Sequence, residues 1–263
     1  TLEDGADICE CPNFFALGNK YVLVFSVWRN HTLYYPVAFV GEFKNLHFYP
    51  EYMQRLDWGM QCFYAPLSFK ANDRQLMFGW LQEQRTKEEQ VKAGWSGVMS
   101  LPRVLSLESN RLKIDFASEL QSLRKESVKL VNLALDKAQT LEGVKSDRLE
   151  LRATFIKNTA QRSGVVLHHG DEKVQVYIDW SAKEIVLDSG SNVYRGTFAN
   201  FTDKVDVHLF ADNSVLELIA NREVALTCRV YPKQLGGSVE LCSEGTCQVL
   251  EVQAWGLETI YSM

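Results

Sequence analysis

Hydrophobic and polar residues alternate along much of the chain, which is the pattern of β-strands that bury one face. In the first 115 or so residues, apolar runs are separated by turn residues such as Gly18-Asn19, Ala71-Asn72-Asp73 and Ser109-Asn110. The runs form two blocks of about four strands each, and we expect a solvated loop at the charged residues 86–92. Repeated blocks of four short strands are typical of the blades of a β-propeller.

The second half of the chain alternates again from Arg148 onward. Strands at this spacing, separated by turns such as Asp188-Ser189-Gly190 and Gly236-Gly237, predict an antiparallel β-sandwich. The apolar positions expected to share a face fall into four sets: Leu149, Leu151, Ala153 and Phe155; Val174, Val176, Ile178 and Trp180; Val205, Val207 and Leu209; and Val224, Leu226, Cys228 and Val230.

The stretch between these two regions has a mixed pattern that suits either a short helix or a strand. We therefore predict an incomplete propeller at residues 1–118, a linker at 119–147 and a sandwich at 148–263. The predicted fold class is all-β, with about two propeller blades before the sandwich. Two blades cannot close a ring, because a propeller needs at least about four.

Composition and charge narrow the class of ligand. With 263 residues, 46% of them hydrophobic, the chain can form two modest cores. The net charge of -5 comes without the clustered Lys and Arg that nucleic acid requires, so a neutral ligand fits better. No apolar run approaches the roughly 18 residues of a membrane helix. The sequence also has no phosphate loop, serine nucleophile elbow or metal-ligand cluster, so we expect no cofactor, no metal, no nucleic acid and no membrane.

Cysteines and glycosylation sequons bear on the compartment. Cys242 and Cys247 flank a predicted hairpin turn, where a disulfide and two thiols fit equally well. Asn30-His31-Thr32 and Asn200-Phe201-Thr202 match the N-glycosylation sequon. With Asn30 and Asn200 as glycan acceptors, the chain is expected to be extracellular.

Glu10 is the candidate for chemistry that the residue pattern itself suggests. It lies in Ile8-Cys9-Glu10-Cys11-Pro12-Asn13-Phe14-Phe15, among thiols, a proline and aromatic rings. A carboxyl group in such surroundings loses hydration, so its pKa should rise and it can donate a proton near neutrality. The alternative is an ordinary glutamate on the surface or on an edge strand.

Several motifs follow one another along the chain in a defined order. They are Glu10-Cys11-Pro12, Leu56-Asp57-Trp58-Gly59, Cys62-Phe63-Tyr64-Ala65-Pro66, Arg74-Gln75-Leu76-Met77-Phe78-Gly79-Trp80-Leu81 and Gly94-Trp95-Ser96-Gly97-Val98-Met99-Ser100-Leu101-Pro102-Arg103. In this order they resemble the C-terminal part of glycoside hydrolase family 32, which contains invertases, inulinases, levanases and fructan exohydrolases. The resemblance spans nearly the whole chain, since Arg229-Val230-Tyr231-Pro232 is similar to that family's C-terminal module.

The resemblance implies a five-bladed propeller, of which this chain would hold about the last two blades, and a retaining glycosidase acting on sucrose or fructans. Glu10 matches the family's acid/base, which protonates the leaving oxygen while a second carboxylate attacks the anomeric carbon. Asp57 matches an aspartate that holds sugar or tunes that glutamate. Tyr64 and Trp80 match positions at the rim of the sugar pocket, where aromatic faces stack on sugar rings.

The attacking aspartate of the family is missing from this pattern. It lies in an Asn-Asp-Pro motif, and a transition-state-stabilising aspartate lies in Arg-Asp-Pro, whereas this sequence contains no Asp-Pro pair. We therefore expect a chain that begins near the fourth blade and is nearly inactive alone. It would be a truncated product or one half of an enzyme completed by an N-terminal fragment. The alternative function is a non-catalytic carbohydrate-binding or interaction module derived from the family.

Overall fold

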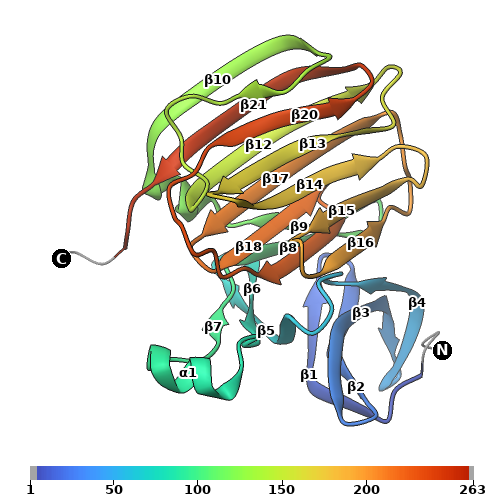
Figure 1. Cartoon of the computed structure of the whole chain (residues 1–263). Helices are drawn as coiled ribbons and strands as arrows, with labels where there is room; N and C mark the ends of the chain where they lie inside the picture. The colour runs from blue at the N-terminus through green and yellow to red at the C-terminus, as the bar shows by residue number, and fades with distance from the viewer. Residues whose placement is uncertain (1–4, 261–263) are drawn as a thin grey trace. The chain divides into compact units, whose positions relative to one another are not determined.

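The computed structural model describes residues 5–260, and Figure 1 shows the course of the chain. The chain divides into two compact units. Unit 1 contains the residues up to Ala117 together with Thr227–Arg229, and unit 2 contains Ser118–Leu226 and the residues from Val230 onward.

Unit 1 is built from antiparallel β-strands and one short helix. Within the described residues, one sheet has the order β1-β2-β3-β4, and the other has the order β5-β6-β8-β9 with β7 paired to β6. The elements are β1 (Ile8–Leu17), β2 (Lys20–Arg29), β3 (Thr32–Lys44), β4 (His47–Arg55), β5 (Phe63–Ala71), β6 (Arg74–Leu81), α1 (Lys87–Ala93), β7 (Val98–Met99), β8 (Arg103–Glu108) and β9 (Arg111–Phe116). Tight hairpins join the first strands: Asn30 and His31, between β2 and β3, have the positive φ of 49° and 58° that a two-residue turn requires.

Hydrogen bonds hold the two sheets of unit 1 together. Ser26 Oγ on β2 accepts from the N–H of Ala65 on β5 at 2.9 Å. Asn13 Oδ1 on β1 accepts from the N–H of Ser68 on β5 at 3.1 Å. Buried polar groups of this kind need partners, so these bonds fix the register of one sheet on the other. They place β1, which carries Glu10, beside β5, which carries Tyr64.

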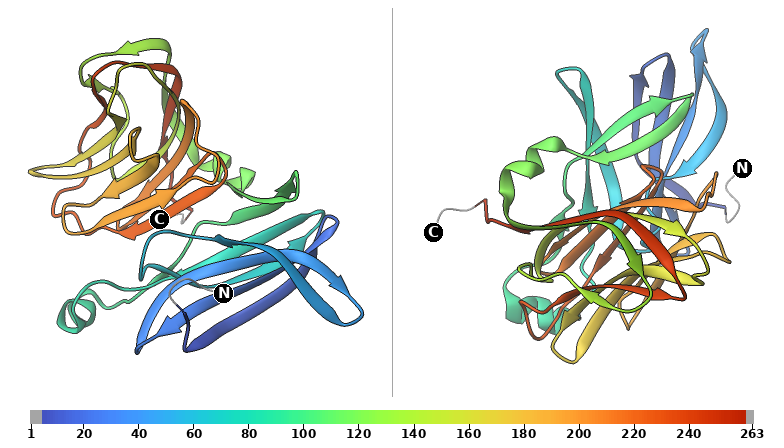
Figure 2. Two further views of the ribbon diagram at one scale, coloured as in Figure 1. Left: turned by 90° about the vertical axis from the view of Figure 1, so that its right-hand side faces the viewer. Right: turned by 90° about the horizontal axis from the view of Figure 1, so that it is seen from above.

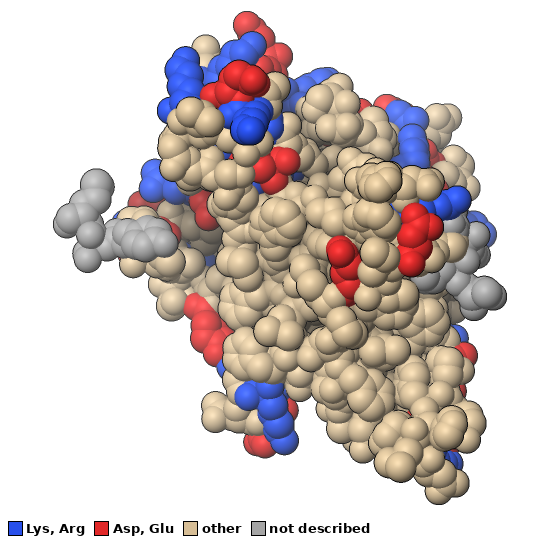
Figure 3. Space-filling view, turned by 90° about the horizontal axis from the view of Figure 1, so that it is seen from below, with Lys and Arg blue, Asp and Glu red and all other residues tan. Residues whose placement is uncertain are grey.

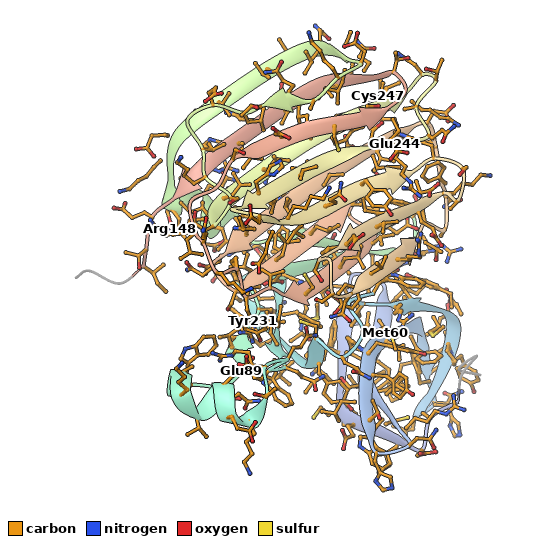
Figure 4. All side chains as sticks on the ribbon, viewed as in Figure 1. Met60, Glu89, Arg148, Tyr231, Glu244 and Cys247 are labelled. Carbon is orange, nitrogen blue, oxygen red and sulfur yellow. The ribbon has the colours of Figure 1, made fainter. Side chains whose placement is uncertain are left out.

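The short helix α1 forms where we expected a solvated loop at residues 86–92. Thr86 is its N-cap: the Thr86 side chain accepts from the N–H of Glu89, and the Glu89 side chain accepts from the N–H of Thr86. Figure 4 labels Glu89 on this helix. None of the residues of α1 is buried, so this capping box supports the helix where apolar packing does not. The Thr-x-x-Glu spacing was the signal for it in the sequence.

Unit 2 is a sandwich of two antiparallel sheets, whose layers can be followed in Figure 2. In the part of the chain that the structure describes, their strand orders are β10-β21-β12-β17-β18-β19 and β11-β20-β13-β14-β15-β16. The elements are η1 (Ser118–Leu123), β10 (Arg124–Leu135), β11 (Gln139–Thr140), β12 (Arg148–Lys157), β13 (Arg162–His169), β14 (Glu172–Asp179), β15 (Glu184–Asp188), β16 (Val193–Thr197), β17 (Lys204–Asp212), β18 (Val215–Ala220), β19 (Val224–Arg229), β20 (Val239–Glu244) and β21 (Cys247–Leu257). Every residue of the four apolar sets expected in this half of the sequence is buried.

The stretch 119–147, where we expected a linker, contains most of η1 and the strands β10 and β11. β10 is 12 residues long and pairs with β21 at the edge of its sheet. An edge strand exposes much of its length, which explains why its sequence pattern is mixed. This segment is therefore a strand of the sheet as well as the connection between the two regions of sequence.

Candidate active site

Glu10 lies on β1, which is an edge strand of its sheet among the described residues. It pairs with Ser26 of β2 immediately before a break in register that runs to Asn13. Cys11, inside that break, has a positive φ of 50°, which marks a β-bulge. Bulges re-aim side chains next to active sites. The Cys-Pro that follows Glu10 thus interrupts the regular pairing beside the candidate carboxylate, and the pairing resumes at Asn13.

Tyr64 is the residue that holds Glu10. Its hydroxyl donates to Glu10 Oε2 at 2.7 Å, and its side chain is almost fully buried at the start of β5. Burial, together with the hydrogen bond to Glu10, raises the pKa of Tyr64 well above its ordinary value of 10. Tyr64 therefore keeps its proton throughout the physiological range and remains a donor to Glu10.

The surroundings predicted for Glu10 from its sequence neighbours are wrong. Cys9 and Cys11 are exposed, Phe14 is 42% exposed, and Glu10 itself is only half-buried. Neighbours along an edge strand point to alternating faces, and the bulge redirects them further, so they do not enclose the carboxylate. The contact that matters comes from Tyr64, 54 positions away.

Asp57 is fully buried and saturated with hydrogen bonds. Its Oδ1 accepts from the N–H groups of Gly59 at 2.8 Å and Thr227 at 3.0 Å. Its Oδ2 accepts from Arg103 Nη1 at 2.9 Å and from Thr227 Oγ1 at 2.6 Å. Because both oxygens are occupied, the geometry favours a structural role for Asp57. Its assignment to sugar binding stays a prediction.

Trp80 on β6 lies directly across from Tyr64 on β5 and is 42% exposed. The structure thus brings three of the predicted residues together: Glu10, Tyr64 and Trp80. The hydrogen bonds of Asp57 lead instead to Arg103 and Thr227. The Glu10–Tyr64–Trp80 group combines a carboxylate, a fixed hydroxyl donor and an exposed indole, which are the parts that a neutral sugar site needs.

Both sequons lie in exposed turns. Asn30 is the first residue of the turn between β2 and β3, and Asn200 lies between β16 and β17. Their exposure is compatible with an attached glycan, and glycosylation at both positions stays a prediction. Cys242 and Cys247, for which a disulfide was one alternative, are free thiols in the structure.

Features of a metal site and of a membrane-spanning helix are absent from residues 5–260. Within this range, no three His, Cys, Asp or Glu side chains group in a way that could hold a metal ion. None of the helices described has the length and hydropathy of a membrane-spanning segment. On the face of the molecule seen in Figure 3, uncharged residues cover most of the surface.

Comparison with known proteins identifies the family. The model of the glycosyl hydrolases family 32 N-terminal domain matches residues 2–115, and the model of the family 32 C-terminal domain matches residues 119–256. The two matches together define a class of glycosidases with an N-terminal domain and a C-terminal β-domain. This chain belongs to glycosyl hydrolase family 32.

Individual relatives agree with this family. The chain is 32% identical over 248 residues to the sucrose-6-phosphate hydrolase of Zymomonas mobilis, covering 85% of the chain and 48% of that protein. It is 27% identical over 241 residues to the raffinose invertase of Escherichia coli, covering 85% of the chain and 50% of that protein. The chain thus spans about half the length of these curated relatives.

Solved structures show the same fold. The exo-inulinase of Aspergillus awamori superimposes with a TM-score of 0.82 at 20% identity, covering 98% of this chain and 59% of that one. Fructan 1-exohydrolase IIa of Cichorium intybus superimposes with a TM-score of 0.80 at 17% identity, covering 95% of this chain and 62% of that one.

These matches correct the predicted fold class. We expected only the C-terminal part of the family, with a partial propeller of about two blades, and this is wrong: models of both family domains match, and together they extend from residue 2 to residue 256. Turn spacing predicts how many strands a stretch forms, but not which domain those strands make up. Counting blocks of four strands as blades therefore misjudged the N-terminal domain.

Proposed function

We propose that this protein acts in the hydrolysis of β-fructofuranosides, sucrose or fructans, by a retaining mechanism with Glu10 as general acid/base. The observation that carries the proposal is the hydrogen bond of 2.7 Å from Tyr64 to Glu10, beside the exposed indole of Trp80. The relatives support the substrate class: they include a sucrose-6-phosphate hydrolase, a raffinose invertase and an exo-inulinase.

In this mechanism Glu10 transfers its proton to the glycosidic oxygen while a second carboxylate attacks the anomeric carbon of the fructosyl unit. Glu10 then accepts a proton from the water that hydrolyses the covalent intermediate. Tyr64 donates to Oε2, so we assign the proton transfer to Oε1. When Glu10 has given up its proton, the hydrogen bond from Tyr64 stabilises the carboxylate that remains.

We propose further that the attacking carboxylate comes from polypeptide beyond these 263 residues, supplied by an N-terminal fragment or subunit. Two observations support this: the sequence contains no Asp-Pro pair, and the chain spans about half the length of its relatives. The sheet β1–β4 also offers an aromatic cluster in which Phe14 contacts Tyr21, Phe43 and Phe48 at 5.4 Å between ring centroids. Phe14 remains 42% exposed there, and exposed aromatic surface of this kind suits a protein partner.

The experiment is a complementation assay with sucrose and inulin. The chain alone should release little fructose, and addition of an N-terminal fragment that carries Asn-Asp-Pro and Arg-Asp-Pro should restore turnover. Glu10→Gln should abolish the restored activity, whereas Glu88→Gln on the exposed helix α1 should leave it intact. Hydrolysis that survives Glu10→Gln would contradict the role of Glu10. Fructan binding without turnover in the complemented protein would instead indicate a binding module.

We also propose that the protein is extracellular and carries glycans on Asn30 and Asn200. The exposed turns that hold both residues support this. Secretion from a eukaryotic host, followed by glycosidase treatment, should show two mass shifts, and Thr32→Ala and Thr202→Ala should each remove one. Unchanged mass after glycosidase treatment of the secreted protein would exclude these sites.

A further inference from the structure

Two phenylalanine rings flank Asn200 in the sequence and contact each other. Phe198 and Phe201, in the segment between β16 and β17, have ring centroids 5.4 Å apart at an interplanar angle of 56°. Ala199 and Asn200, which lie between them, are both exposed, whereas the two phenylalanines are half-buried. The chain therefore turns back between the two phenylalanines, with the aromatic pair beneath the turn and Asn200 on its exposed side.

This aromatic pair is anchored to the core of unit 2. Phe201 contacts Trp180 edge-on, with ring centroids 5.8 Å apart at an interplanar angle of 65°. Trp180 is 2% exposed, and its Nε1–H donates to Ser163 Oγ at 3.1 Å. Phe198 is thus the last ring of a series that begins in the core, and packing against the other rings sets its position.

Hydrogen bonds hold the backbone on both sides of Asn200. The N–H of Ala199 donates to Glu223 Oε1 at 2.5 Å. On the other side, Thr202 Oγ1 donates to the carbonyl of Lys204 at 2.8 Å. The turn is therefore ordered before a sugar is attached, so a contact between the sugar and the turn costs little further ordering of the protein.

We propose that Phe198 is the platform for the first N-acetylglucosamine of a glycan on Asn200, and that this contact stabilises unit 2. The inference rests on the proposed glycosylation of Asn200. In that modification, Asn200 Nδ2 bonds to the anomeric carbon of a lipid-diphosphate-linked oligosaccharide, the lipid diphosphate leaves with the bonding electrons, and the amide loses a proton. The C–H face of the attached sugar then packs on the apolar face of the Phe198 ring, which removes both from water.

The other sequon offers a comparison inside the same chain. Trp28 also precedes Asn30 by two residues, but it lies on β2, where it is paired with Leu33 of β3. A side chain on a strand stands roughly perpendicular to the sheet, whereas Asn30 lies in the turn beyond the ends of the two strands. We therefore expect a glycan on Asn30 to lack an aromatic platform.

The test compares the unfolding temperature of the full chain, secreted from a eukaryotic host, with that of its Asn200→Gln variant. The glycan on Asn200 should raise the unfolding temperature by about 3 °C when Phe198 is present, and by less than about 1 °C in the Phe198→Ala background. Phe198→Leu, which keeps an apolar side chain without the aromatic face, should give the same result as Phe198→Ala and serves if the alanine variant does not fold.

Three controls isolate the contact. In protein made in bacteria without glycans, Asn200→Gln should not change the unfolding temperature. In the secreted protein, Asn30→Gln should leave the gain from the Asn200 glycan intact. Val193→Ala should leave it intact as well, since Val193 lies on β16 of the same unit with 51% exposure and is not part of the aromatic pair.

Trimming the glycan shows which sugar makes the contact. An endoglycosidase that leaves a single N-acetylglucosamine on Asn200 should preserve the gain, because the first sugar is the one that packs on Phe198. The inference is overturned by a gain of the same size in the Phe198→Ala background, by loss of the gain on trimming to one sugar, or by absence of any gain.

The mass of the secreted protein separates this inference from the proposed glycosylation. A glycan on Asn200 whose stabilising effect does not depend on Phe198 leaves the glycosylation standing and removes the platform. Absence of a glycan from Asn200 in the secreted protein overturns both.

Discussion

Glu10 and Asp57 are two carboxylates of the same unit in opposite surroundings. Glu10 is half-buried on an edge strand, and the hydrogen bond found for it comes from Tyr64 to one oxygen. Asp57 is 0% exposed, and each of its oxygens accepts two hydrogen bonds. A side chain held by four donors is suited to joining segments of the fold. One with an accessible oxygen can exchange a proton with a ligand, so full burial favours a structural role for a carboxylate rather than a chemical one.

The largest effect that this contrast predicts concerns activity. Glu10→Gln should lower kcat for sucrose by about 10²–10⁴-fold, because it removes the transferable proton. It should change the free energy of unfolding by less than about 0.5 kcal/mol, as a substitution outside the packed core does. Steady-state kinetics of the sucrose-hydrolysing preparation and urea denaturation check the two parts. A strong loss of stability in Glu10→Gln would mean that Glu10, like Asp57, has a structural role.

Asp57→Ala should do the opposite and destabilise unit 1. Removing one partner of a buried ion pair leaves Arg103 uncompensated, at a cost of about 3–5 kcal/mol. Both side chains of this pair are 0% exposed. Urea denaturation measures the loss, with Asp73→Ala in the exposed turn between β5 and β6 as the control. A loss below about 1 kcal/mol would mean that Asp57 is not structural.

Glu150 in unit 2 is another buried carboxylate, and its contribution to the stability of the fold depends on pH. It is 1% exposed and accepts hydrogen bonds from Arg124 Nε at 2.6 Å and His208 Nε2 at 2.8 Å. Burial alone would raise the pKa of Glu150, but these hydrogen bonds outweigh it and lower the pKa from its usual 4.5 to about 2. Because the pKa of Glu150 is lower in the folded protein, its ionised carboxylate stabilises the fold at pH values above 4.5. This stabilisation is lost as the pH falls from 4.5 toward 2.

The expected loss over that interval is about 2 kcal/mol after allowance for solvent screening. Urea denaturation at pH 5 and pH 3 measures it, and Glu150→Gln should reduce the difference between the two conditions. Glu251→Gln is the control, because Glu251 belongs to the same sheet and is 50% exposed in its pair with Lys129. An identical pH dependence in Glu150→Gln would refute the assignment.

The smallest expected effect is that of Tyr64→Phe, which removes one hydrogen bond from Glu10. The loss should be about 1 kcal/mol, or roughly fivefold in kcat, with KM for sucrose little changed. Tyr52→Phe is a matched control, since the Tyr52 hydroxyl accepts from the N–H of Leu112 and does not serve Glu10. A larger rise in KM than fall in kcat would make Tyr64 a substrate ligand rather than the partner of Glu10.

In the N-terminal region, turn residues predicted individual hairpins but not the domain that the strands form. Gly18-Asn19 and Ser109-Asn110 marked hairpins that the structure contains, between β1 and β2 and between β8 and β9. The family matches nevertheless overturned the partial propeller that was inferred from those hairpins. A local turn specifies the pairing of two strands, whereas the identity of a domain depends on the whole arrangement of sheets.

Alternation and turn residues determined the all-β character of the chain and the buried faces of four sandwich strands, because strand periodicity is a local property. The ordered motifs singled out Glu10, Asp57, Tyr64 and Trp80. Only the tertiary structure decided how these residues differ: Tyr64 reaches Glu10 across 54 positions, and Asp57 accepts two hydrogen bonds from Thr227 across 170. Such contacts depend on how sheets pack, and no local pattern of residues encodes that packing.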